Sequence, residues 1–196
     1  MTAQDMQRRN LLRWAGTGAV ATAAGVVGLT GQAQAAPRAS TDPRQTAREQ
    51  ANKAIVGRWF DGFWGPTYDP AIVEALAAPD MLLQYSLHVP RRGRTDIRAF
   101  MKDFRTSFPD LAFAGTAPLI AQGDLVVGRW LGGGTHTGAA FSDFLLGSLP
   151  AATGRKMHFS GTTVLRLAGG RIVEEIGLDD GVTALTQLGL VAPIRA

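Results

Sequence analysis

The stretch AGGRIVEEIGLDD, residues 168–180, combines a glycine turn, a strand-like run and two adjacent acidic residues. Side chains along a strand point alternately to its two faces, so Ile176, Leu178 and Asp180 share one face while Asp179 lies on the other. If Ile176 and Leu178 line an apolar pocket, Asp180 lies at the wall of that pocket. A carboxyl group in such a place could hold and release a proton.

Upstream of this stretch, apolar residues again recur at every second position, which predicts further strands. Strands are expected over residues 81–87, 111–121, 125–133, 157–167 and 171–178, with QGDL (122–125) and AGGR (168–171) as tight turns. Strands that are joined by such short turns pair antiparallel.

The first half of the chain has a helical pattern instead. Residues 43–64 repeat apolar side chains at four-residue spacing, after a capping Thr41 or Asp42 and before Gly65. Shorter helices are expected over residues 70–77, 95–108 and 182–188. Three helices followed by a curved antiparallel sheet indicate an α+β fold, in which one face of the sheet packs on the helices.

The first 36 residues have the pattern of an export signal. Arg8 and Arg9 precede an apolar, glycine-rich segment, and small residues at 33–35 suit a cleavage site. The paired arginines favour the twin-arginine route, with an ordinary secretory signal or a retained membrane anchor as alternatives. We therefore expect a signal peptide at 1–36, a polar linker at 37–42 and one domain at 43–196, exported to the periplasm or secreted.

The composition limits the chemistry of the mature domain. The 196 residues include no cysteine, which excludes disulfides, a thiolate nucleophile and cysteine metal ligands. The chain carries 20 basic and 16 acidic residues, and the balance is close to neutral without the export signal, which argues against nucleic-acid binding. His88, His136 and His158 lack the spacing of a zinc site, so no metal is expected.

Six short motifs occur in order along the predicted domain. They are FPDL (108–111), GDLVVGRW (123–130), GTHTG (134–138), TGRKMHFSG (153–161), GRIVEE (170–175) and QLGL (187–190). Together they resemble the SnoaL-like polyketide cyclases, also called ester cyclases, of the nuclear transport factor 2-like superfamily. The resemblance implies a cone-shaped fold around a deep apolar pocket. It also implies ring closure by an intramolecular aldol reaction without a metal or an organic cofactor.

Asp180 is the first catalytic candidate. When GRIVEE and QLGL are both aligned with the family, its catalytic aspartate falls on Asp180. An aldol reaction needs a group that removes a proton beside a carbonyl and later protonates the new alcohol, and one carboxyl can do both. An apolar cavity raises the proton affinity of such a carboxyl, because it disfavours the charged form. The alternative is that Asp180, directly before a helix, is the N-cap of that helix.

His136, in GTHTG, is the second catalytic candidate. On an unbroken strand it shares a face with Trp130, where a neutral imidazole could donate to a substrate carbonyl or pass a proton to Asp180. A structural histidine that is bonded to a backbone carbonyl is the equal alternative. Glycines 132–134 could also introduce a bulge that reverses the face.

The predicted pocket takes an apolar small molecule with a carbonyl group. Its expected lining is Trp59, Phe63, Phe104, Trp130, Ile176 and Leu178. Ile176 stands where the family usually has tryptophan, and export is unusual for polyketide tailoring, so the substrate stays open. The apolar insertion AAFSDFLLGSLPAA, residues 139–152, could form a lid over the pocket, a dimer contact or a membrane-facing patch.

Three functions are consistent with these residues. The first is an exported enzyme of the SnoaL-like type, and the second is a non-catalytic binder of small molecules with the same fold. The third is an interaction module that uses residues 139–152 at an interface. A homodimer is the expected assembly in each case.

Overall fold

A computed structural model describes residues 43–192 of the chain. The predicted signal peptide (1–36) and linker (37–42) lie outside the described residues. Within the described part of the chain, no helix is long and apolar enough to cross a membrane.

The chain begins this region with one long helix that ends in a wider turn. Helix α2 (Pro43–Trp59) continues without a break into the π-helical turn η1 (Phe60–Trp64). The Gly65 amide donates to the Phe60 carbonyl at 2.8 Å and closes the turn. The helical segment thus ends at Trp64, directly before Gly65, as predicted. Such π-turns are frequently found at functional sites, and this one places Phe60, Phe63 and Trp64 in the core.

Two further helices follow along the chain. They are α3 (Ala71–Leu76) and α4 (Arg94–Ser107), close to the predicted ranges. Helix α4 is strongly amphipathic and buries Ile97, Phe100, Met101 and Phe104. The short helix α5 (Gly181–Gln187) comes after the last strand, also as predicted.

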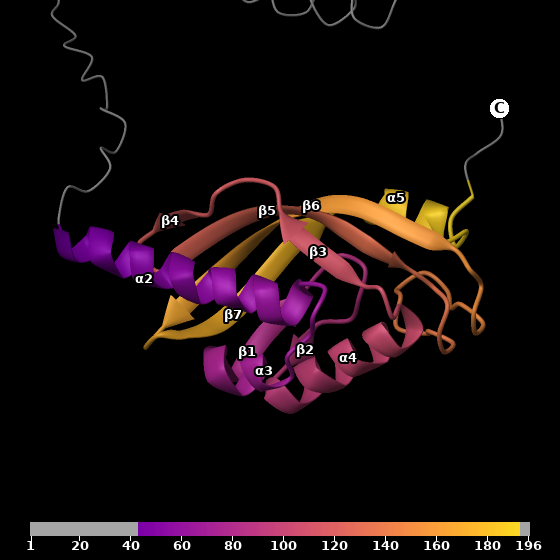
Figure 1. Cartoon of the computed structure of the whole chain (residues 1–196), viewed down its shortest axis with the longest axis horizontal. Helices are drawn as coiled ribbons and strands as arrows, with labels where there is room; N and C mark the ends of the chain where they lie inside the picture. The colour runs from indigo at the N-terminus through magenta and orange to yellow at the C-terminus, as the bar shows by residue number, and fades with distance from the viewer. Residues whose placement is uncertain (1–42, 193–196) are drawn as a thin grey trace, which may run out of the picture. The chain divides into compact units, whose positions relative to one another are not determined.

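Seven strands form one sheet. They are β1 (Ala77–Gln84), β2 (Arg91–Arg92), β3 (Ala112–Gly115), β4 (Ile120–Gln122), β5 (Leu125–Thr135), β6 (Lys156–Ala168) and β7 (Arg171–Asp179). Their order is β2-β1-β7-β6-β5-β3, with β4 beside β5, and every pair is antiparallel except β1 with β7. The sheet is curved and does not close, and α2 runs in front of β5 to β7 while α3 and α4 lie near β1 and β2 (Figure 1). The predicted α+β class is confirmed.

Two of the predicted strands have different bounds. The strand expected over 81–87 starts four residues earlier, at Ala77. The strand expected over 111–121 is two strands, β3 and β4, which both pair with β5. The interruption between them contains Pro118, and a proline cannot donate to a strand ladder.

A β-bulge in β7 sets the direction of every later side chain in that strand. Leu167 of β6 pairs with Ile172, but the next β6 residue, Arg166, pairs with Glu174. Val173 is therefore an extra residue in β7, and the alternation of faces shifts by one position after it. Ile172 is fully buried before the bulge. After it, the odd-numbered residues face the core.

Candidate functional site

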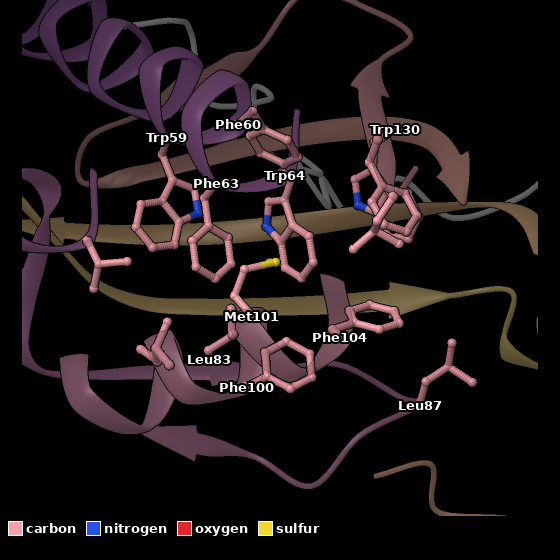
Figure 2. Close-up of a cluster of buried hydrophobic side chains, with 14 of the residues drawn as sticks. Trp59, Phe60, Phe63, Trp64, Leu83, Leu87, Phe100, Met101, Phe104 and Trp130 are labelled. Carbon is pink, nitrogen blue, oxygen red and sulfur yellow. The ribbon is translucent and has the colours of Figure 1, made fainter. Parts of the chain in front are cut away.

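A narrow pocket lies between the inner face of the sheet, η1 and helix α4. It holds about 350 Å³ of space that atoms do not fill, part of it open to solvent. Its lining is mostly aromatic and consists of Phe60, Trp64, Tyr85, Leu87, His88, Phe104, Phe113, Trp130, Phe159 and Asp179. Figure 2 shows the rings of η1 on one side and those of α4 on the other. The ionisable side chains among these lining residues are Tyr85, His88 and Asp179.

Asp179 ends β7 on the inner face of the sheet. Its Oδ1 atom is buried and has no hydrogen-bond partner among the described residues. Burial raises the pKa of Asp179, although the neighbouring Ser86 and His88 act in the opposite direction. A carboxyl with raised proton affinity in an apolar pocket is suited to give and take protons.

His88 forms the neighbouring part of the wall. It is 7% exposed, its ring stacks on Phe144 at 5.3 Å, and it contacts Phe104 at 5.0 Å. Its Nδ1 lies 3.6 Å from Oδ2 of Asp143, which also pairs with Arg91. Burial alone would raise the pKa of Asp143, but His88 and Arg91 lower it, so the carboxylate is charged beside the imidazole. The carboxylate therefore lies beside the imidazole, although neither His88 Nδ1 nor Asp143 Oδ2 has a hydrogen-bond partner among the described residues.

A second buried acid lies directly behind the pocket wall. Glu175 is 0% exposed, and its carboxyl accepts from Trp59 Nε1 at 2.7 Å, from Trp64 Nε1 at 2.9 Å and from the Tyr85 hydroxyl at 2.5 Å. Burial raises its pKa to about 7, against the lowering effect of these three donors. Since protein atoms surround the Glu175 carboxyl, it does not line the pocket itself.

The prediction that Asp180 lies at the pocket wall is wrong. Asp180 is exposed, and its Oδ1 accepts from the Thr183 amide at 3.2 Å as the N-cap of α5. The N-cap alternative is therefore the one that the structure shows. The reason is the bulge at Val173, which shifts the alternation so that Asp179 points inward and Asp180 does not.

His136 is on the predicted face but outside the pocket. Strand β5 pairs with β6 without a break through glycines 132–134, so no bulge reverses its parity with Trp130. The His136 ring is 0% exposed, with Nδ1 2.9 Å from Thr153 Oγ1 and Nε2 2.8 Å from the Ala139 carbonyl. Both ring nitrogens are therefore occupied by protein atoms. The alternative of a structural histidine that is bonded to a backbone carbonyl therefore fits His136. Its expected contact with Asp180 does not occur.

The predicted lining residues divide into three pairs. Phe104 and Trp130 line the pocket as expected. Trp59 and Phe63 stack on each other at 4.3 Å, fully buried beside the pocket, and are not part of its lining. Ile176 and Leu178 are 36% and 76% exposed and face away from the pocket, because they follow the bulge. For these last two residues the prediction is wrong.

The 139–152 insertion packs against α4 and the His88 end of the pocket. Phe141 and Leu149 exchange backbone hydrogen bonds of 3.0 and 2.8 Å, and Phe141 stacks on Phe104 at 5.2 Å. Phe144 forms an isolated bridge with His88. Most of the apolar surface of the insertion is thus used inside the fold, while Leu145 and Leu146 are more than half exposed.

Sequence reasoning missed Asp179, Glu175, Tyr85 and His88 as site residues. The glycines of the last two strands were a usable signal, because a glycine inside a strand often marks the close approach of another group. A Cβ atom at Gly177 would overlap the Tyr85 ring, and a Cβ atom at Gly161 would overlap the Trp130 ring. No such signal exists for the bulge, which depends on strand pairing.

The ionisable residues of the described region are dispersed. No group of three or more His, Asp or Glu side chains that could hold a metal ion occurs in the region 43–192. The class that these features define is an α+β protein whose curved sheet and helices enclose an aromatic pocket with one partly buried carboxyl, Asp179, at its wall.

Comparison with known proteins gives the family. The sequence profile of the SnoaL-like polyketide cyclases matches residues 54–188, and the chain belongs to this family. A search of curated proteins found no match.

Solved structures show the same fold. A protein from Jannaschia sp. CCS1, assigned as a SnoaL-like polyketide cyclase, is 22% identical over 74% of this chain and 95% of its own, with a TM-score of 0.61. IdmH from Streptomyces antibioticus, assigned as a polyketide cyclase, is 27% identical over 70% of this chain and 98% of its own, with a TM-score of 0.52. AclR from Streptomyces galilaeus, assigned as a hydroxylase, is 21% identical over 77% of this chain and 86% of its own, with a TM-score of 0.54.

Proposed function

We propose that this protein catalyses cofactor-free proton transfer on an apolar small molecule with a carbonyl group, as an aldol-type cyclase or a related carbonyl isomerase. The observation that carries the proposal is the buried, partnerless Oδ1 of Asp179 at the wall of an aromatic pocket. Membership of the polyketide cyclase family supports the same chemistry. Asp179 takes the place that the sequence had indicated for Asp180.

The proposed reaction uses one carboxyl group twice. The Asp179 carboxylate removes a proton from the carbon beside a carbonyl, and the electron pair of that C–H bond forms an enolate. The enolate carbon attacks a second carbonyl of the same molecule and forms the new carbon–carbon bond. The alkoxide that results takes the proton back from Asp179, so the enzyme returns to its starting state.

His88 has an assisting role in this proposal. Its ring lies in the pocket wall with Nδ1 toward the charged Asp143. Its other nitrogen, Nε2, donates a hydrogen bond to the carbonyl oxygen on which the enolate charge develops, which stabilises the transition state electrostatically. The remaining wall is aromatic and excludes water from the carboxyl.

Proton removal can be tested without knowing the natural substrate. Deuterium exchange at the α-carbon of 2-tetralone in D₂O is followed by proton NMR with the wild type, Asp179→Asn and Asp180→Asn. We expect the Asp179→Asn rate to fall by about 10²-fold or more, since a positioned acid or base contributes that much. Asp180→Asn is the matched control and keeps a rate near that of the wild type. Equal rates for Asp179→Asn and the wild type would refute the proposal.

Non-catalytic binding in the same pocket is the second candidate function. The observation in its favour is that the pocket is narrow and walled almost entirely by aromatic rings. A pure binder would retain a ligand without changing it. Mass spectrometry of compounds extracted from the purified protein, before and after incubation, separates the two functions, because only catalysis changes the mass or chromatographic retention of the ligand.

The exposed Leu145 and Leu146 are the residues that an interaction module would use.

We also propose that the protein is exported, on the basis of Arg8, Arg9 and the apolar segment after them. The test is fractionation of cells that express the full chain. Replacement of both arginines by lysine is expected to leave the protein in the cytoplasm if the twin-arginine route is used. An unchanged extracytoplasmic fraction for that variant would point to the ordinary secretory route.

A further inference from the structure

Three aromatic residues form one side of the pocket and share a single support. Trp64, Tyr85 and Trp130 lie in a row, with ring centroids 5.3 Å apart for the first two and 6.1 Å apart for the last two. We call these three residues the aromatic wall. All three line the pocket, and each carries one polar hydrogen, on an indole nitrogen or a hydroxyl.

Each of these polar hydrogens points away from the pocket into one hydrogen-bond chain. Trp64 Nε1 donates to Glu175 Oε1 at 2.9 Å, and the Tyr85 hydroxyl donates to the same oxygen at 2.5 Å. Trp130 Nε1 donates to Thr163 Oγ1 at 2.8 Å, and that oxygen is 3.0 Å from the Tyr85 hydroxyl. Because Tyr85 gives its proton to Glu175, the Thr163 hydroxyl must donate to Tyr85. The chain thus runs from Trp130 through Thr163 and Tyr85 to Glu175.

Two glycines seat the rings that this chain holds. Gly177 of β7 lies under the Tyr85 ring, and Gly161 of β6 lies under the Trp130 ring, so closely that a Cβ atom at either position would overlap the ring. The rings therefore lie against the sheet backbone, and the hydrogen bonds fix their orientation on it. Neither feature depends on the protonation state of Asp179.

We propose that Glu175 is a positioning residue that determines the ligand specificity of the pocket. By accepting from Trp64 and Tyr85, and by holding Trp130 through Thr163, it keeps the polar atoms of the aromatic wall away from the ligand. The ligand then meets hydrocarbon surface along this wall, and polar groups only at Asp179 and His88. The pocket accordingly selects compounds that are flat and apolar along one side and carry their carbonyl at the other end. This inference rests on the proposed function only in taking the pocket as the ligand site.

A pair of probes that differ by one hydroxyl tests the proposal. The dissociation constants of acetophenone and 4-hydroxyacetophenone are measured by isothermal titration calorimetry near pH 8. We expect the wild type to prefer acetophenone by about tenfold or more, because the added hydroxyl is buried against the aromatic wall without a partner. Similar affinities for both compounds, or no binding of either, would overturn the proposal.

The variant Glu175→Gln removes the common acceptor. An amide oxygen accepts at most two of the three hydrogen bonds that the carboxylate accepts, and the NH₂ group faces the third donor, so the rings of Trp59, Trp64 and Tyr85 are no longer all held in their orientation. We expect the preference for acetophenone to fall below about threefold in this variant. The matched control is Glu174→Gln, because Glu174 is partly exposed on the other face, near Arg166. It should keep the wild-type preference.

A purely structural role for Glu175 predicts a different result. Glu175→Gln would then fold with the near-ultraviolet circular dichroism of the wild type and keep the wild-type preference, which would overturn the proposal. If this variant does not fold, Thr163→Val decides, since it has nearly the same shape and frees Trp130 Nε1 from its acceptor. If Thr163→Val prefers acetophenone over 4-hydroxyacetophenone less strongly than the wild type, the proposal is supported. An unchanged ratio of the two dissociation constants contradicts it.

The specificity role of Glu175 and the proposed catalytic function can fail separately, because different measurements test them. Ligand preference is a binding measurement and needs no turnover, so Asp179→Asn is expected to keep the preference for acetophenone while it loses α-proton exchange. An Asp179→Asn protein that still exchanges protons would refute the proposed function. The specificity role of Glu175 would stand unaffected.

Discussion

Asp179 and Asp180 are adjacent residues of the same type in opposite surroundings. Asp179 faces the pocket with a buried oxygen that has no partner among the described residues, whereas Asp180 is exposed and bonded to the first turn of α5. Two acids on the same face of β7, the fully buried Glu175 and the partly buried Asp179, have different partners. Glu175 has three donors, and Asp179 has an oxygen left for a ligand. The hydrogen-bond partners of each carboxyl, and not the residue type, thus distinguish the structural acid Glu175 from the candidate catalytic acid Asp179.

Glu175 should make the stability of the protein depend on pH. Its folded pKa is raised to about 7 from 4.5, so its contribution to stability is fully present below about 4.5 and is lost as the pH rises through about 7. Relative to Glu175→Gln, the wild type should lose about 3 kcal/mol of unfolding free energy between about pH 5 and pH 8. Urea unfolding at several pH values measures this difference. Parallel pH profiles for the two proteins would contradict it.

Asp180 should matter for stability and not for proton transfer. Asp180→Ala removes the N-cap of α5 and should lower the free energy of unfolding by about 0.5–2 kcal/mol. Thermal or urea unfolding measures the loss. A stable Asp180→Ala protein without activity would show that the sequence-based assignment of this residue was functionally correct.

At the scale of elements, the bulge in β7 and the insertion 139–152 shape the site. The bulge brings Glu175, Gly177 and Asp179 to the inner face, where the acids meet the pocket wall and the glycine seats a ring. The insertion places Phe144 on His88 and brings Asp143 to its Nδ1. Both elements therefore position the ionisable groups of the pocket.

The insertion should be part of the folded core. Phe141 is 3% exposed and stacks on Phe104, so Phe141→Ala should lower the free energy of unfolding by about 3–5 kcal/mol. Leu145→Ala, at a position that is 58% exposed, is the control and should change it by about 0.5 kcal/mol or less. Urea unfolding of the two variants gives the comparison. A small effect for Phe141→Ala would mean that the insertion packs loosely and acts mainly at an interface.

At the scale of the whole domain, the sheet has one face on the core and one partly apolar face outside. Val164 and Ile176 pair across β6 and β7 on the outer face, next to Leu178, and these three are 40%, 36% and 76% exposed. Exposed apolar side chains that gather on one surface often mark a contact with another chain. This surface is the basis on which we propose a homodimer.

The homodimer makes a direct prediction for sedimentation. The wild type should sediment as a dimer, and Leu178→Glu should sediment as a monomer, because a charge in the centre of the contact is left without a partner. Leu146→Glu, on the insertion, is the control and should remain dimeric. A monomeric wild type, or a dimer broken only by Leu146→Glu, would contradict this assignment of the contact.

Sequence reasoning predicted the fold better than the site, and the reason is physical. Helices α2 and α4 and strands β5 to β7 follow from periodicity, which is a local property of the chain. The direction of Asp179 depends on a bulge, which appears only when β6 and β7 are paired. Phe104 and Trp130 line the pocket as expected, whereas Trp59 and Phe63, which have the same aromatic character, pack beside it, so residue type alone does not separate lining from core. Glu175 could not be recognised, since its three donors come from positions 59, 64 and 85.

The central claim is that the Asp179 carboxyl lies in a water-poor pocket, and carboxyl titration by ¹³C NMR tests it most directly. The signal of Asp179 is identified by its absence in Asp179→Asn and followed with pH. We predict a midpoint above the ordinary value for aspartate, about 3.9, because burial disfavours the charged form. A midpoint at or below that ordinary value would contradict the account, because a carboxyl that ionises as easily as one in water is not in such a pocket.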